Sequence, residues 1–112
     1  MQQIIARMAS TAISIFLATL IFPSGLHAQN DAAKVFKANC TLCHGEDGSA
    51  NTPTGKALKA RDLRSDDVQK QTDAQLAAVI TKGSGKMPAF GSKFSPDMIK
   101  SLVAYIRQLP KK

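Results

Sequence analysis

The stretch Cys40-Thr41-Leu42-Cys43-His44 holds both cysteines of the 112-residue chain, with a histidine directly after the second one. Three chemistries use cysteines that are this close together: a redox dithiol, a zinc site and covalent attachment of haem. The sequence on either side of the stretch decides among them.

The first 28 residues have the order of parts that is typical of a secretory signal peptide. Arg7 is followed by an apolar run over residues 8–22, then by the helix-breaking residues 23–25 and by Leu-His-Ala over residues 26–28. The apolar run is shorter than the roughly 20 residues that span a bilayer, which disfavours a retained anchor. We expect cleavage after Ala28, export to the periplasm, and no stable membrane insertion afterwards.

The remaining residues, 29–112, are expected to form one small domain. The formal net charge of +7 falls to +6, because the signal segment removes a single charge, Arg7. A domain of this size usually needs disulfides, a metal or a cofactor to complete its core. A disulfide between Cys40 and Cys43 would close too short a loop to constrain much of the chain. A bound group is therefore expected to complete the core.

The pattern of this domain predicts an all-α fold. Residues 31–39 indicate a short amphipathic helix that runs into the cysteines, and residues 72–75 (Thr-Asp-Ala-Gln) fit a capping box. The helix that follows the capping box is expected to end at Gly83. Ser95 and Pro96 open the last helix. Its buried face is marked by apolar residues at helical spacing, namely Ile99, Leu102, Val103, Ile106 and Leu109.

Two segments between the helices predict loops. Residues 45–55 are rich in Gly, Asn, Asp and Pro, and residues 83–94 combine glycines with apolar residues. Between them, Ser65 is placed to cap a short helical turn before Thr72. The sequence shows no convincing strand, internal repeat or linker.

The surroundings of the two cysteines disfavour two of the three chemistries. A redox dithiol is expected in a pattern of alternating strands and helices, which this chain lacks. A structural zinc site needs four ligands, and the other histidine, His27, leaves with the signal peptide. His44 directly beside Cys43 is also awkwardly placed to bind the same zinc ion.

Covalent haem attachment explains both the spacing and the export. Cys-x-x-Cys-His is the signature of c-type haem, because one helical turn presents both thiols to the vinyl groups on one edge of the porphyrin. The adjacent His44 then supplies a ligand to the iron. One covalently attached haem c would also give the small domain a large apolar core.

The second axial ligand of the iron decides what the haem does. An open position suits oxygen or peroxide chemistry or gas sensing, whereas a second strong ligand makes an electron carrier. The expected mature chain holds two methionines, Met87 and Met98. Met98 lies in the last helix and is expected to pack in the core, whereas Met87 lies in a loop. Met87 is therefore the predicted ligand, and its thioether would raise the reduction potential relative to a second imidazole.

With these motifs in place, the chain resembles small, soluble, single-haem class I cytochromes c of bacterial and photosynthetic type. The resemblance is carried by the stretches CTLCHGEDG, PTG, KMPAF and LVAYIRQLP and covers nearly all of residues 29–112. It implies thioethers at Cys40 and Cys43, and haem ligation by His44 and Met87.

The same resemblance implies a crossing of the first and last helices and a partner for the haem-binding histidine. Phe36, Leu102 and Tyr105 match the family positions at the crossing, where Ala32 replaces a frequent glycine. A family proline accepts a hydrogen bond from the haem-binding histidine, and Pro53 is the candidate for that role.

The basic character of the chain indicates a protein partner with an acidic docking patch. Seven lysines are expected near the haem edge or its flanking loops, at positions 34, 37, 56, 59, 82, 86 and 93. Nucleic acid is a poor partner for an exported protein with few free aromatics.

Three functions stay open from sequence. The first is a monomeric periplasmic carrier of single electrons in a respiratory chain, which is not an enzyme. The second is a haem enzyme or sensor whose sixth ligand is open or displaceable. The third is an electron-transfer subunit of a larger respiratory or dehydrogenase complex.

Overall fold

The computed structural model describes residues 25–111, with side chains from residue 27 onward. This part of the chain is helical, as predicted, and contains no strand beyond an isolated bridge between Ser84 and Met87. The helices are α1 (Gly25–Asn39), α2 (Thr41–His44), α3 (Pro53–Leu58), α4 (Asp66–Gln69), α5 (Asp73–Lys82) and α6 (Pro96–Arg107). Within residues 25–111, no helix has both the length and the apolar character needed to cross a bilayer.

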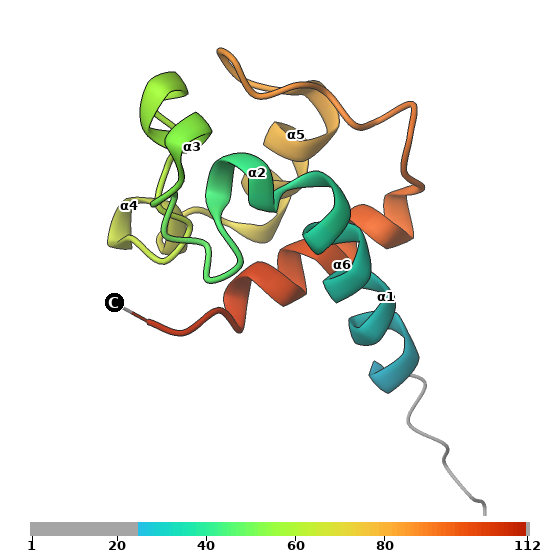
Figure 1. Cartoon of the computed structure of the whole chain (residues 1–112). Helices are drawn as coiled ribbons and strands as arrows, with labels where there is room; N and C mark the ends of the chain where they lie inside the picture. The colour runs from blue at the N-terminus through green and yellow to red at the C-terminus, as the bar shows by residue number, and fades with distance from the viewer. Residues whose placement is uncertain (1–24, 112) are drawn as a thin grey trace, which may run out of the picture.

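The core is built on the packing of α1 against α6, which Figure 1 shows crossing each other. Phe36 and Leu102 are the largest fully buried side chains, and Ala32 is fully buried as well. The Phe36 and Tyr105 rings pack with their centroids 5.1 Å apart, a tilted pairing that contributes about 1 kcal/mol beyond its buried area. The predicted helix crossing is confirmed, and the Ala32 methyl is accommodated inside it.

The start of α1 differs from the prediction. The helix begins at Gly25, six residues before Asp31, and residues 27–30 are exposed. These residues include neither proline nor glycine, so nothing in them stops the helix from extending beyond the core. The expected signal peptide falls mostly on residues 1–24, which lie outside the described residues, so cleavage after Ala28 stays a prediction.

The predicted caps of the last two long helices are confirmed. The Thr72 hydroxyl accepts a hydrogen bond from the Gln75 backbone N–H, and the Gln75 side chain accepts one from the Thr72 N–H. Ser95 caps α6 by accepting a hydrogen bond from the Met98 N–H. Both helices therefore begin at positions that the sequence specifies locally.

One helix was missed, because α3 begins inside the segment that was predicted to be a loop. Thr52 caps it by accepting a hydrogen bond from the Gly55 N–H at 2.8 Å, and Pro53 occupies the first turn. A capping threonine followed by proline is a helix-start signal, and the glycines and asparagines around it hid that signal. The short turn α4 follows Ser65 as predicted, but the serine side chain makes no capping bond.

A single arginine joins the end of α6 to the connection between α4 and α5. The Arg107 guanidinium donates to the backbone carbonyls of Gln69, at 2.8 Å, and Gln71. It also pairs with the Asp73 carboxylate at 2.9 Å. These bonds fix the start of α5, whose residues Leu76 and Val79 line a cavity in the fold.

Candidate haem-binding site

The two cysteines and the histidine sit on one helical turn, as the spacing predicted. Cys40 is the N-cap of α2, and the His44 N–H donates to the Cys40 carbonyl at 2.9 Å. The Cys40 N–H in turn donates to the Phe36 carbonyl of α1 at 2.8 Å. The turn is therefore a direct continuation of the helix that packs against α6.

This turn borders a cavity of about 490 Å³, with a smaller apolar pocket of about 60 Å³ behind it. The volume of the larger cavity lies in the roughly 300–1,000 Å³ range of cofactor and ligand sites. Cys40, Cys43, His44 and Met87 all line it. The remaining wall is mostly apolar and includes Leu58, Leu63, Val68, Leu76, Val79, Pro88 and Phe90.

The imidazole of His44 is oriented by a backbone carbonyl. Its Nδ1 lies 3.0 Å from the carbonyl oxygen of Arg61. Because a carbonyl only accepts hydrogen bonds, Nδ1 carries the proton and Nε2 keeps its lone pair for a metal. Pro53 was expected in this role, but it lies exposed at the first turn of α3, and Arg61 provides the carbonyl instead.

The loop that follows the Cys40–His44 turn and helix α3 both pack against that turn. The Thr52 hydroxyl lies 2.8 Å from the Leu42 carbonyl and 3.1 Å from the Cys43 carbonyl, at the end of α2. Gly55 is buried directly against the same turn, where an added Cβ would lie 2.1 Å from the Cys43 carbonyl oxygen. α3 therefore packs so closely on α2 that only glycine fits at this position.

Met87 comes to the cavity on the segment that follows α5. A pair of backbone hydrogen bonds joins Ser84 and Met87, at 2.9 and 3.1 Å. Before this turn, Gly83 has a φ of +75°, and a Cβ there would lie 2.7 Å from the Met87 carbonyl oxygen. After the turn, the Phe90 N–H donates to the Ile80 carbonyl of α5 at 2.9 Å. The backbone around Met87 is thus held on both sides.

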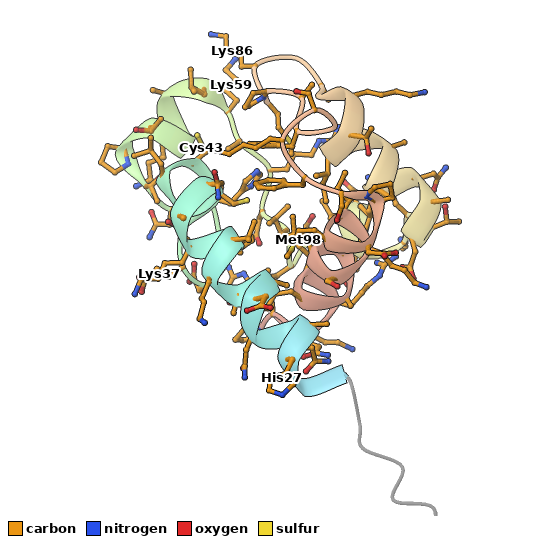
Figure 2. The ribbon with its side chains drawn as sticks, turned by 90° about the vertical axis from the view of Figure 1, so that its right-hand side faces the viewer. His27, Lys37, Cys43, Lys59, Lys86 and Met98 are labelled. Atoms are coloured by element: carbon orange, nitrogen blue, oxygen red, sulfur yellow. The ribbon has the colours of Figure 1, made fainter. Side chains whose placement is uncertain are left out.

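Met98 has a different environment from Met87. It is half-buried against the core cluster and is absent from the lining of the cavity. In Figure 2 it lies on α6, away from Cys43. This placement agrees with the expectation that Met98 is a packing residue.

Burial changes the chemistry of the Cys40 thiol. Desolvation, reinforced by the neighbouring Cys43 thiol and opposed by the Lys93 ammonium, raises the pKa of Cys40 to about 11. Redox-active and metal-binding cysteines need the thiolate, which a lowered pKa provides. The Cys40 thiol is therefore neutral near pH 7.

The seven lysines that were expected near the haem edge or its flanking loops do not all line the cavity. Lys59 and Lys86 line the cavity, together with Arg61. Figure 2 shows Lys59 and Lys86 at the same end of the molecule, with Lys37 elsewhere. No carboxylate lines the cavity in the described part of the chain, so its opening is cationic.

Other lysines of the expected set have partners of their own. Lys34 lies 3.9 Å from the Asp31 carboxylate, and Lys37 lies 3.8 Å from that of Glu46. Lys93 bonds to the Asn39 side chain. Lys56 and Lys82 are exposed and do not line the cavity. Of the lysines that were expected near the haem edge, Lys59 and Lys86 lie at the cavity. Together with Arg61 they form its cationic opening.

The residues at this cavity fit a covalently held haem. They offer two thiols on one turn, an imidazole with its Nε2 available, and a thioether from a separate segment. A zinc site does not fit, because no group of three or more His, Cys, Asp or Glu side chains gathers anywhere in residues 25–111.

Comparisons with known proteins agree with this site. Residues 27–106 match the family described as cytochrome C oxidase, cbb3-type, subunit III. The chain is 34% identical to cytochrome c6 of Picosynechococcus sp. (strain PCC 7002), over 89% of this chain and 91% of that protein. It is 36% identical to the cbb3-type cytochrome c oxidase subunit FixP of Azorhizobium caulinodans, over 78% of this chain and 29% of that protein. A solved structure, the KustC0563 c-type cytochrome, superposes with a TM-score of 0.65 at 32% identity, covering 72% of this chain and 98% of that one.

The fold and the site define a small class I cytochrome c. The chain belongs to the cytochrome c family that its residues 27–106 match. It holds one haem c covalently and carries electrons.

Proposed function

We propose that this cytochrome carries single electrons with a haem that is joined to Cys40 and Cys43 and ligated by His44 and Met87. The observation that carries the proposal is that these four side chains, from two separate segments, line one cavity. A bound haem c supplies reversible one-electron chemistry at its iron.

Each of the ligating residues has a distinct part in this proposal. His44 presents Nε2 as the proximal ligand, and the Arg61 carbonyl holds the ring in that orientation through Nδ1. Met87 presents a neutral thioether, which stabilises the ferrous state and raises the potential. The apolar wall around them keeps water away from the iron, which further favours the state of lower charge.

We further propose that residues 1–28 are a cleaved signal peptide and that residues 29–112 work in the periplasm as a monomer, within a respiratory chain. The apolar run that precedes small residues in the sequence supports export. Donor and acceptor proteins would then be exported or membrane-bound redox proteins.

The cationic opening is the proposed docking surface for a partner with an acidic patch. Lys59, Arg61 and Lys86 border the cavity, and Leu58 lines it while 37% exposed. A small exposed apolar surface beside cationic side chains suits brief encounters, because the charges steer the approach while one apolar side chain adds little to the lifetime of the complex.

Replacing Lys59 and Lys86 together by glutamine tests this surface. We expect oxidation of the ferrous protein by ferricyanide, an anionic probe, to slow about three- to tenfold at low ionic strength. Lys34→Gln with Lys37→Gln removes the same charge from side chains paired with carboxylates elsewhere, and is expected to change the rate little. Stopped-flow absorbance gives both rates, and the difference should vanish in about 0.5 M salt. Equal slowing by both pairs would refute a local docking surface.

Carbon monoxide separates a carrier from a haem enzyme or sensor. If Met87 occupies the sixth position, ferrous protein at neutral pH should bind carbon monoxide slowly, at a rate that stops rising with gas concentration. Rapid binding that scales with concentration would favour the enzyme or sensor.

The similarity to FixP keeps the complex-subunit function as a second candidate. Purification from the native host at low and at high salt distinguishes it from a free carrier. A free carrier should separate from every other protein at high salt, whereas a subunit should retain its partner under both conditions.

A further inference from the structure

The segment that carries Met87 is tied to α1 as well as to α5. The Lys93 ammonium donates a hydrogen bond to Asn39 Oδ1 at 2.6 Å, joining positions that are far apart in the sequence. Asn39 is the last residue of α1, directly before Cys40, and lines the same cavity as Met87. This bond therefore links the segment that carries Met87 to α1, the helix that directly precedes Cys40.

Two aromatic rings, those of Phe94 and Phe90, connect Lys93 to the interior of the protein. The Lys93 ammonium lies 5.6 Å from the centroid of the Phe94 ring, and Phe94 stacks on Phe90 at 5.3 Å with an interplanar angle of 12°. Phe90 and Phe94 line the inner apolar pocket together with Met87. Lys93 is thus connected through Phe94 and Phe90 to the pocket that Met87 also lines.

The backbone hydrogen bonds at Phe90 and Gly91 tie this segment to α5 rather than to α1. The Phe90 and Gly91 N–H groups donate to the Ile80 and Thr81 carbonyls, which belong to α5. Asn39 Nδ2 meanwhile donates to the Val35 carbonyl at 2.8 Å, which fixes its side chain for Lys93. The Lys93–Asn39 bond thus joins the segment that carries Met87 to the end of α1. The Asn39 side chain that accepts this bond is already held in place by Val35.

We propose that the Lys93–Asn39 bond is a clasp that slows the departure of Met87 from the iron. The inference rests on the proposed ligation by His44 and Met87. Lys93 is a positioning residue, because it acts through the segment that holds the ligand. With the clasp open, residues 83–94 keep their anchors on α5 but separate more readily from α1, and the sixth position opens more often.

The rate of carbon monoxide binding to the ferrous holoprotein at saturating gas measures this opening. Lys93→Met keeps an aliphatic side chain over Phe94 but removes the charge and the donor. We expect binding about fivefold faster than in the wild type, equivalent to about 1 kcal/mol and typical of one hydrogen bond. Lys93→Arg, which can still donate, should restore a rate close to that of the wild type.

Lys82→Met is the matched control, since it removes the same charge from an exposed lysine at the end of α5. It should leave the rate unchanged. Asn39→Ala should accelerate binding, and the double variant Lys93→Met with Asn39→Ala should be no faster than the faster single variant.

The outcomes separate the clasp from the ligation on which it rests. Rapid, concentration-dependent binding in the wild type would overturn the Met87 ligation itself. Slow wild-type binding with no change in Lys93→Met would overturn the clasp alone. Equal acceleration by Lys93→Met and Lys82→Met would assign the effect to net charge and would also overturn the clasp.

Discussion

Gly55→Ala is expected to destabilise the fold strongly, because its added Cβ makes the shortest contact of any of the glycines in residues 27–111. The new Cβ would lie 2.1 Å from the Cys43 carbonyl oxygen and 2.8 Å from that of Ala50. Both are backbone atoms of the turn that bears the cysteines and of the loop after it, so neither can rotate away. We expect a loss of about 3 kcal/mol or more in the free energy of unfolding.

Urea unfolding of the holoprotein, followed by far-ultraviolet circular dichroism, measures this loss. Gly85→Ala is the control, because no protein heavy atom beyond its chain neighbours lies within 4 Å of its added Cβ. Its φ of +56° still disfavours alanine, so a loss of about 1 kcal/mol is expected. Losses of equal size in the two variants would mean that α3 does not pack on α2 as closely as described.

Met87→Ala is expected to keep the haem attached while opening its sixth position. The thioethers at Cys40 and Cys43 do not depend on the methionine, so the covalent link should survive. Loss of the neutral sulfur ligand should lower the reduction potential and let carbon monoxide bind rapidly. It should also abolish the weak far-red ferric absorption band that arises from sulfur–iron ligation. Truncation of a half-buried methionine should also cost about 2 kcal/mol of stability.

Met98→Ala provides the matched comparison for this prediction. It truncates a methionine that is half-buried against the core outside the cavity, so stability should fall while the far-red band stays. The spectra of both variants decide between the methionines. A far-red band that persists in Met87→Ala would point to Met98 as the ligand, whereas low-spin ligation without that band would point to Lys86.

The parts of the fold that could be predicted from the sequence are those that depend on residues close together in the chain. The capping box at Thr72 and the Ser95 cap follow from hydrogen bonds between near neighbours. The buried face of α6 follows from its helical spacing, and its predicted core residues are buried, although Leu109 lies beyond the end of the helix at Arg107. Cys40 to His44 form a single turn because the motif itself is that short.

The missed features depend on contacts between distant segments or on backbone atoms. The partner of His44 is the carbonyl of Arg61, and because every residue has a carbonyl, no side chain marks the position. Lysine positions alone likewise cannot say that Lys59 and Lys86 meet at one opening while Lys93 binds Asn39. The start of α3 had a local signal in Thr52 and Pro53, but neighbouring loop-forming residues outweighed it in the prediction.

An optical spectrum of the purified protein, recorded in the ferric state and after reduction with dithionite, tests the His44–Met87 haem most directly. We predict sharp low-spin ferrous bands together with a weak far-red ferric band from sulfur–iron ligation. High-spin bands would contradict Met87 as the resting ligand. Absence of any haem spectrum, after expression in a host that attaches c-type haem, would contradict covalent haem attachment itself.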